Sequence, residues 1–162
     1  MSNIILNIYL AIHLIVPQLP TYLARSYAAA IAERIENYTP DISYLTYITI
    51  ISHESKFNTN AISQDGMDWG LMQVRAKYYG APATNLLNAD ANIRAGAYIL
   101  RESERVCRRL LGREPGLEEI LSLYTGSLPS CKPNKLTHIL LNYQVCLEDE
   151  IERGVENNEC NF

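Results

Sequence analysis

Residues 53–74 read HESKFNTNAISQDGMDWGLMQV, and they place two carboxylates at the two ends of a polar turn. The first, Glu54, follows a largely apolar run at residues 48–51. Apolar surroundings disfavour the charged form of a carboxyl group, so Glu54 is a candidate general acid. The second, Asp68, comes 14 residues later on a polar segment, where an aspartate keeps its charge more easily. Two carboxyl groups in contrasting environments are what glycosidic bond cleavage requires.

Other catalytic motifs do not fit this stretch. His53-Glu54 would begin a zinc-binding HExxH motif, but position 57 is Phe57, so the second histidine ligand is missing. No serine lies in a GxSxG sequence, and no glycine-rich phosphate-binding loop occurs. Considered alone, a glutamate such as Glu54 near a helix end is usually a solvated surface residue.

Length and composition indicate an ordinary globular protein. The chain has 162 residues, of which 48% are hydrophobic and 20% charged, which predicts one domain with a sizeable core. The formal net charge of -4 gives no field that attracts nucleic acid, so no nucleic-acid partner is expected. Six of the 14 basic residues lie at residues 94–113, whereas residues 148–159 are strongly acidic. We interpret both segments as solvated helix faces.

All four cysteines lie in the C-terminal third of the chain, and their state is open. No pair has CxxC spacing and no histidine stands at ligand spacing, so no metal site is expected. An even number of cysteines is compatible with two disulfides, which would place the chain outside the reducing cytosol. The alternative is four thiols buried as small hydrophobic groups. The cysteines are Cys107, Cys131, Cys146 and Cys160.

The N-terminus carries a 13-residue run, residues 4–16, that is apolar except for Asn7 and His13. A bilayer span needs about 20 residues, so the run is short for a membrane helix. It has the length of a signal-peptide core, but the first basic residue, Arg25, follows the run instead of preceding it. Three interpretations stay open: an uncleaved export signal or anchor, a membrane-surface helix, and a helix packed on the domain.

Helical periodicity dominates the rest of the chain. The longest apolar stripe, at residues 91–111, has Asn88 or Asp90 as a candidate cap and Gly112 as a natural end. Residues 57–67 predict a loop or a short hairpin. Helices are predicted at residues 26–37, 43–55, 91–111, 117–124 and 136–152.

The segment at residues 43–55 is the ambiguous one. Its Tyr, Thr and Ile content favours a strand by propensity. However, its apolar residues fall on one helical face, and Thr39 with Pro40 forms a helix-start sequence before it. We therefore predict a buried helix that ends at the candidate acid, Glu54.

The stretch around Glu54 resembles the lytic transglycosylases of the lysozyme-like superfamily. That family carries an ES dipeptide, an N-x-x-A-x-S turn and a GLMQ box, matched here by Glu54-Ser55, residues 58–63 and residues 70–73. A second block, which includes Asn92-Ile93 and Gly96, looks like the family's N-I-x-x-G helix. The two blocks in this order are specific, and the resemblance covers residues 26–127.

The resemblance implies roles for individual residues and no cofactor. Glu54 would protonate the glycosidic oxygen between N-acetylmuramic acid and N-acetylglucosamine in peptidoglycan, and then act as base on the muramic 6-hydroxyl, closing a 1,6-anhydro ring. Ser55 would support this carboxyl by a hydrogen bond, and Met72 and Gln73 would face the sugar, while Leu71 is expected in the core. The implied substrate-binding residues are Ser55, Ser63, Gly70, Met72, Gln73, Tyr98 and Tyr124.

Two departures from the family pattern bear on activity. The third family motif, A-Y-N-x-G, is replaced by LSLYTGS at residues 121–127, which lacks the asparagine. Tyr124 is either the motif tyrosine or a core tyrosine. Asp68 gives a D-W-G-L-M-Q sequence similar to D-Y-G-x-x-Q of animal-type lysozymes and secretion-associated transglycosylases. This second carboxylate would stabilise positive charge on the sugar; the alternative is a turn aspartate bonded to backbone.

These inferences together predict a mainly α, lysozyme-like α+β domain with a small loop or hairpin beside the catalytic helix. We expect an apolar segment at residues 1–24, the transglycosylase domain at residues 25–153 and a tail at residues 154–162. The protein is expected in the periplasm or on a virion, acting on peptidoglycan strands, with a phage or secretion machine as partner and membrane contact through residues 4–16. The alternatives are a hydrolase using Glu54 and Asp68, and a weakly active glycan-binding structural component.

Overall fold

The structure is a computed structural model that describes residues 2–78, 82–126, 130–153 and 160. Within these residues, helices predominate and the only sheet has two short strands, so the mainly α prediction is confirmed. The helices are α1 (Asn3–Ile15), α2 (Thr21–Tyr38), α3 (Tyr44–Ser55), α4 (Ala89–Leu111), α5 (Leu117–Tyr124) and α6 (Lys135–Arg153). The strands β1 (Asp68–Trp69) and β2 (Val74–Arg75) are followed by the short 3-10 helices η1 (Ala76–Tyr78) and η2 (Ala83–Leu87).

Helix α3 is the buried element, which resolves its ambiguous sequence. Residues 45–51 are all buried, so the β-branched residues there have apolar neighbours on every side of the helix. Burial of a continuous apolar run outweighs its strand propensity. The expected start at Thr39 was wrong: the helix begins after Ser43, whose hydroxyl accepts from the backbone of Leu45 at 3.2 Å. Thr39 instead ends α2, and its hydroxyl lies 2.7 Å from that of Tyr47.

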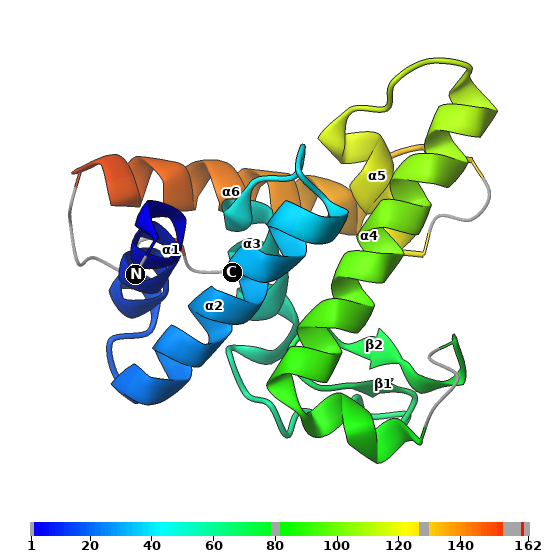
Figure 1. Ribbon diagram of the computed structural model, residues 1–162. Helices are drawn as coiled ribbons and strands as arrows, with labels where there is room; N and C mark the ends of the chain where they lie inside the picture. The colour runs from blue at the N-terminus through cyan, green and yellow to red at the C-terminus, as the bar shows by residue number, and fades with distance from the viewer. Residues whose placement is uncertain (1, 79–81, 127–129, 154–159, 161–162) are drawn as a thin grey trace.

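The other helices surround α3. Figure 1 shows α6 running across one side of α3, α1 and α2 together at one end of the molecule, and the long α4 slanting past the β1–β2 hairpin. Helix α3 packs against α6, α2 and α1, while α4 packs against α2 and α5. This arrangement leaves the C-terminal end of α3 directed toward the segment that leads into the hairpin.

Helix α1 packs on the domain, which was the third interpretation of the apolar N-terminus. Ile8, Ala11 and Ile12 are buried and join the same core cluster as α2 and α3. None of the described helices combines the length and the apolar character required to cross a bilayer. Leu6 and Leu10 remain 42% and 53% exposed on the outer face of α1. The domain boundary predicted after residue 24 stays a prediction.

The ends of α4 follow the sequence. Of the two candidate caps, Asn88 is the one used, since its side chain accepts from the backbone of Ala91 at 3.0 Å. Gly112 ends the helix in the left-handed conformation with φ +68°, as predicted. Ile93 and Leu100 on the predicted stripe are fully buried. Both ends of this long helix, against which the hairpin packs, are therefore fixed by capping residues.

The four cysteines form two disulfides, Cys107–Cys131 and Cys146–Cys160, so the free-thiol alternative was wrong. The first joins α4 to the segment before α6, and both of its cysteines are buried, 0% and 2% exposed. The second ties residue 160 to the middle of α6, and both of its cysteines are partly exposed.

The first disulfide is expected to contribute more to stability than the second. The two disulfides join cysteines separated by 24 and 14 positions. Replacing Cys107 and Cys131 together by alanine should lower the free energy of unfolding by about 3.5 kcal/mol from loop closure, and further because a buried contact is lost. The Cys146→Ala/Cys160→Ala variant should lose about 3 kcal/mol or less. Urea denaturation measures both; a larger loss in the second variant would contradict the assignment of the buried disulfide as the main crosslink.

Candidate active site

Glu54 is the penultimate residue of α3, at the point where the chain turns sharply. Lys56 and Phe57, with φ 51° and 61°, adopt the left-handed conformation that stops the helix. Phe57 then returns to the core, where it is 3% exposed and stacks on Tyr27 with 6.4 Å between ring centroids. The Glu54 side chain is 22% exposed. It is therefore shielded from most of the solvent but still accessible to a bound molecule.

Ser63 organises the turn between the two candidate carboxylates. Its hydroxyl donates to Asp65 at 2.6 Å and accepts from the backbone amides of Met67 and Asp68 at 3.1 and 2.9 Å. The hydrogen bond from Ser63, followed by that from the Met67 amide, lowers the pKa of Asp65. These three hydrogen bonds fix the shape of the turn before β1, which explains why a serine stands at this position.

Asp68 is bound by an arginine across the hairpin. The two strands are antiparallel and place Asp68 opposite Arg75. Arg75 Nε and Nη2 each donate to one carboxylate oxygen of Asp68 at 2.8 Å, a bidentate charge-assisted pair. Asp68 is 23% exposed and, with Ser63, Gln64 and Asp65, lines a shallow hollow of about 400 Å³. The alternative of a turn aspartate bonded to backbone is thus replaced by a cross-strand ion pair at the edge of a hollow.

Gly70 begins the GLMQ box and has no room for a side chain. Its φ is +75°, and an added Cβ would lie 2.2 Å from the carbonyl oxygen of Leu86 and 2.3 Å from Nδ2 of Asn92. Its amide donates to the carbonyl of Ala61 at 2.8 Å. The glycine is therefore required by the close approach of the box to η2 and α4, which places its role in packing.

Asn92 on α4 is the residue that fixes the box, and sequence reasoning assigned it no role. Its side chain is fully buried and makes three hydrogen bonds. Nδ2 donates to the carbonyls of Trp69 and Leu86 at 2.7 and 2.9 Å, and Oδ1 accepts from the amide of Met72 at 2.7 Å. The signal was present as the asparagine of the second sequence block, but only the contact shows what it binds.

The expectation that Met72 faces sugar was wrong. Its side chain is fully buried, as is that of Leu71, which was expected in the core. An added Cβ on Gly96 of α4 would lie 2.3 Å from the Met72 sulfur, so the absence of a side chain at Gly96 makes the space that Met72 fills. The box therefore contributes backbone to the site and apolar side chains to the core.

Of three further predicted residues, Gln73 and Ser55 form hydrogen bonds with nearby backbone, and Tyr98 is exposed. Gln73, in the left-handed conformation with φ 45°, donates through Nε2 to the carbonyls of Ala61 and Gly70 at 3.2 and 2.9 Å. The Ser55 hydroxyl donates to the carbonyl of Ile51 at 3.1 Å within its own helix, so this hydrogen bond stabilises α3 and does not involve the Glu54 carboxyl. Tyr98 stands 57% exposed on α4. Whether any of these contacts substrate stays a prediction.

Tyr124 joins the end of α5 to the GLMQ box. It is the last residue of α5, and its hydroxyl donates to the carbonyl of Met72 at 2.7 Å. Burial, followed by the negative charges of Glu54 and then, more weakly, of Asp68, raises the pKa of Tyr124 well above its usual value. The phenol therefore stays neutral and lies within electrostatic range of both carboxylates. The end of the third motif, at residue 127, lies outside the described residues.

His53 is the titratable neighbour of Glu54. Its Nδ1 lies 3.5 Å from Oε1 of Glu54. The interaction with the Glu54 side chain raises the pKa of His53 and outweighs the opposing effect of burial. No arginine or lysine forms an ion pair with Glu54 among the described residues. The carboxyl is thus free to exchange a proton with a bound molecule.

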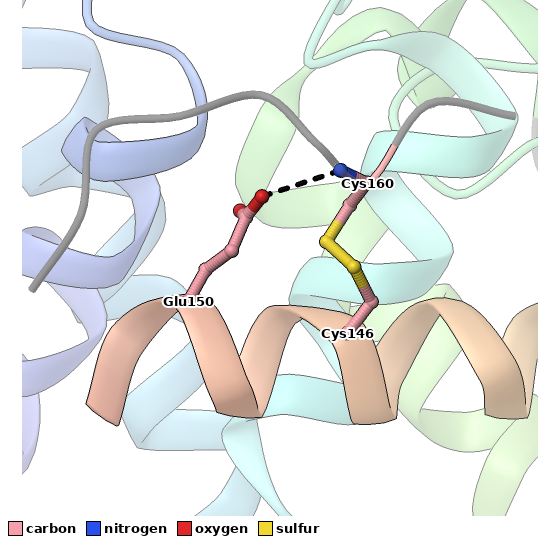
Figure 2. Close-up of side chains that lie close together, drawn as sticks. All are labelled: Cys146, Glu150 and Cys160. Carbon is pink, nitrogen blue, oxygen red and sulfur yellow. Dashed lines mark hydrogen bonds between the residues drawn. A yellow bond between two sulfur atoms is a disulfide. The ribbon is translucent and has the colours of Figure 1, made fainter. Parts of the chain in front are cut away.

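One group of side chains has the spacing of a metal site but not the chemistry. Ligand atoms of Cys146, Glu150 and Cys160 all lie within 4.8 Å of one another. Figure 2 shows that the two sulfurs are joined to each other and that Glu150 accepts from the backbone amide of Cys160, at 3.2 Å. A disulfide offers no thiolate, so these residues hold Cys160 against α6 and do not form a metal centre.

Comparison with known protein families matches the transglycosylase SLT domain over residues 30–113, just over half of the chain. A search of curated proteins and a search of solved structures found no significant match. The chain belongs to the transglycosylase SLT family. Membership supports lytic transglycosylase activity in general and peptidoglycan as the substrate.

Two glycines that share the left-handed conformation test the role of the box. Gly70→Ala should lower the free energy of unfolding by about 3 kcal/mol, because a strained φ and a clash with the Leu86 carbonyl add together. Gly66→Ala is the matched control: its φ is +72°, but nothing lies within 4 Å of the added Cβ. It should cost about 1 kcal/mol. Equal losses in urea denaturation would show that Gly70 is needed for φ alone.

Proposed function

We propose that this member of the SLT family cleaves the β-1,4 bond between N-acetylmuramic acid and N-acetylglucosamine, with Glu54 as acid and then base. The observation that supports this most is the position of Glu54: a carboxyl 22% exposed at the end of a buried helix, without an arginine or lysine partner among the described residues. A carboxyl in this position is shielded from most of the solvent and is still within reach of a bound polymer. An acid catalyst needs such access, because its proton must lie within hydrogen-bond reach of the oxygen that it protonates.

The reaction is balanced without water or cofactor. Protonated Glu54 gives its hydrogen to the glycosidic oxygen as the bond from that oxygen to the muramic C1 breaks. The Glu54 carboxylate then takes the proton of the muramic 6-hydroxyl, and the oxygen so activated bonds to C1. The products are a free 4-hydroxyl on one sugar and a 1,6-anhydro ring on the other, and Glu54 ends protonated as it began.

Neighbouring groups support the same residue in this role. The hydroxyl of Tyr124 donates to the Met72 carbonyl, and its raised pKa keeps the phenol neutral within electrostatic range of Glu54. A neutral phenol there leaves the positive charge that develops at C1 to be balanced by carboxylates. The polar hollow that includes Ser63 and Asp68 offers acceptors for sugar hydroxyls.

A hydrolase using Glu54 and Asp68 is the second candidate. Asp68 lines the hollow, and a carboxylate in that place would stabilise a positively charged sugar ring. Its bidentate pair with Arg75 offsets much of that charge, so we rank this candidate second. A glycan-binding structural component is the third candidate, motivated by the absence of an asparagine from residues 121–127.

We further propose that the protein acts at the cell wall, in the periplasm or on a virion, within a phage or secretion machine. The two disulfides support a location outside the reducing cytosol. The apolar outer face of α1, which includes Leu6 and Leu10, is a candidate contact with a membrane or with that machine. Isolation of a stable complex after crosslinking in the native host would support this context, and a fully active free monomer in that host would oppose it.

Glu54→Gln should abolish the clearing of purified peptidoglycan, lowering turnover by about 100-fold or more, because the amide cannot donate the proton. Its melting temperature should stay near that of the original protein. Glu102→Gln, on the surface of α4 and 31% exposed, is the matched control and should clear normally. Mass spectrometry of the products should show 1,6-anhydro ends. Reducing ends would favour the hydrolase, and equal clearing by Glu54→Gln would favour the structural component.

Asp68→Asn compared with Arg75→Gln separates a direct role of Asp68 from a structural one. If the Asp68 charge acts on the sugar, Asp68→Asn should lower turnover roughly tenfold, and Arg75→Gln, which keeps that charge, should lower it less. Both variants lose the pair between Asp68 and Arg75, and Arg75→Gln also loses the longer pair with Asp65 at 4.0 Å, so its melting temperature should fall at least as far as that of Asp68→Asn. Equal losses of turnover that follow the melting temperature would assign Asp68 to the hairpin alone.

A further inference from the structure

The imidazole of His53 is placed against the proposed acid in a way that its helix does not require. Consecutive side chains on a helix diverge and do not normally meet. Here Nδ1 of His53 nevertheless lies 3.5 Å from Oε1 of Glu54. The two side chains are 27% and 22% exposed, so both are mostly withdrawn from water.

The same nitrogen has no other partner. Nδ1 of His53 is buried and makes no hydrogen bond within the part of the chain that the structure describes. A buried polar atom without a hydrogen bond is costly, so its proximity to a carboxylate compensates for that cost. The contact is strongest when the imidazole is protonated and the carboxyl ionised, because opposite charges then face each other across 3.5 Å.

We propose that His53 is a positioning residue that controls how much of Glu54 carries its proton, and thereby sets the pH range of the reaction. The inference rests on the proposed role of Glu54 and names a second residue in the same site. His53 contacts the carboxyl and not the sugar, so it acts through Glu54.

The direction follows from the mutual stabilisation of opposite charges. The Glu54 side chain raises the pKa of His53, so the imidazolium is favoured and persists above its ordinary range. The imidazolium in turn favours the ionised form of Glu54, since the two protonation states are linked. The effect is present at low pH and is lost as pH rises through the raised pKa of His53. While His53 is charged, the form of Glu54 that can donate is therefore less populated.

Other groups near this end of α3 do not replace Glu54 as the partner. The charge that acts on His53 is that of Glu54, whereas Arg34 acts on Tyr47, nearer the start of α3. Helix α1 contains no Asp, Glu, Lys or Arg. Titratable or charged side chains that act on α3 from neighbouring elements include Tyr143 and Glu148 of α6, Arg34 of α2 and Tyr124 of α5. Tyr143 bonds to Ser52, Glu148 acts on Tyr44, Arg34 acts on Tyr47, and Tyr124 lies within electrostatic range of Glu54.

Titration of the histidine signals by NMR tests the contact without any substrate. In Glu54→Gln, the midpoint of His53 should move to lower pH, because the partner charge is gone. His138, exposed on α6, is the internal control, and its midpoint should not move. An unchanged His53 midpoint would overturn the proposal, as would an equal movement of His138. Neither result depends on whether Glu54 catalyses the reaction.

The pH profile of kcat/KM on purified peptidoglycan tests the consequence. His53→Gln should exceed the original protein about twofold at pH 5.5, and the two should coincide at pH 8.5. The gain is modest because both side chains keep some exposure to water, and a partly exposed ion pair is weak. His138→Gln should follow the original protein throughout. A ratio independent of pH would overturn the proposal, whereas activity retained in Glu54→Gln would overturn the proposed function instead.

Discussion

The buried side chain of Asn92 is the contact on which the geometry of the site depends. It stands on α4 and binds three backbone groups, the carbonyls of Trp69 and Leu86 and the amide of Met72. These groups belong to the hairpin region and to η2, so the Asn92 side chain joins both segments to α4. Because an unmade hydrogen bond in a buried place is costly, the three bonds hold the GLMQ box in a single position. Gly70 and Gly96 have no side chains at the points of closest approach.

The carboxyl of Glu54 depends on that fixed wall. Helix α3 is buried along most of its length, and Glu54 at its C-terminal end lies within electrostatic range of Tyr124, whose hydroxyl donates to the Met72 carbonyl of the box. The result is a carboxyl held at the boundary between core and solvent. A fully exposed carboxyl would not be shielded from solvent, and a fully buried one would not reach a polymer. The proposed chemistry uses the intermediate position.

The rest of the molecule supports this boundary from a distance. The disulfide between Cys107 and Cys131 ties the far end of α4 to the segment before α6, and α6 packs directly on α3. At Ser52, two residues before Glu54, the hydroxyl of Tyr143 on α6 lies 2.5 Å from the serine oxygen. The elements that bear the site are therefore crosslinked through covalent and hydrogen-bonded contacts that lie outside it.

The sequence alone was sufficient for the features that depend on local order. Helical period, the cap at Asn88 and the stop at Gly112 depend on neighbouring residues, and the family pattern depends on residue identity, so the helices and the family followed from the chain. Burial and long-range pairing depend on residues far apart in sequence. The buried Met72, packed against Gly96, and the bonds of Asn92 to Trp69 and Met72 belong to this second group. Only the tertiary structure decides them, because a side chain's direction is set by the surface that packs against it, and here that surface comes from another part of the chain.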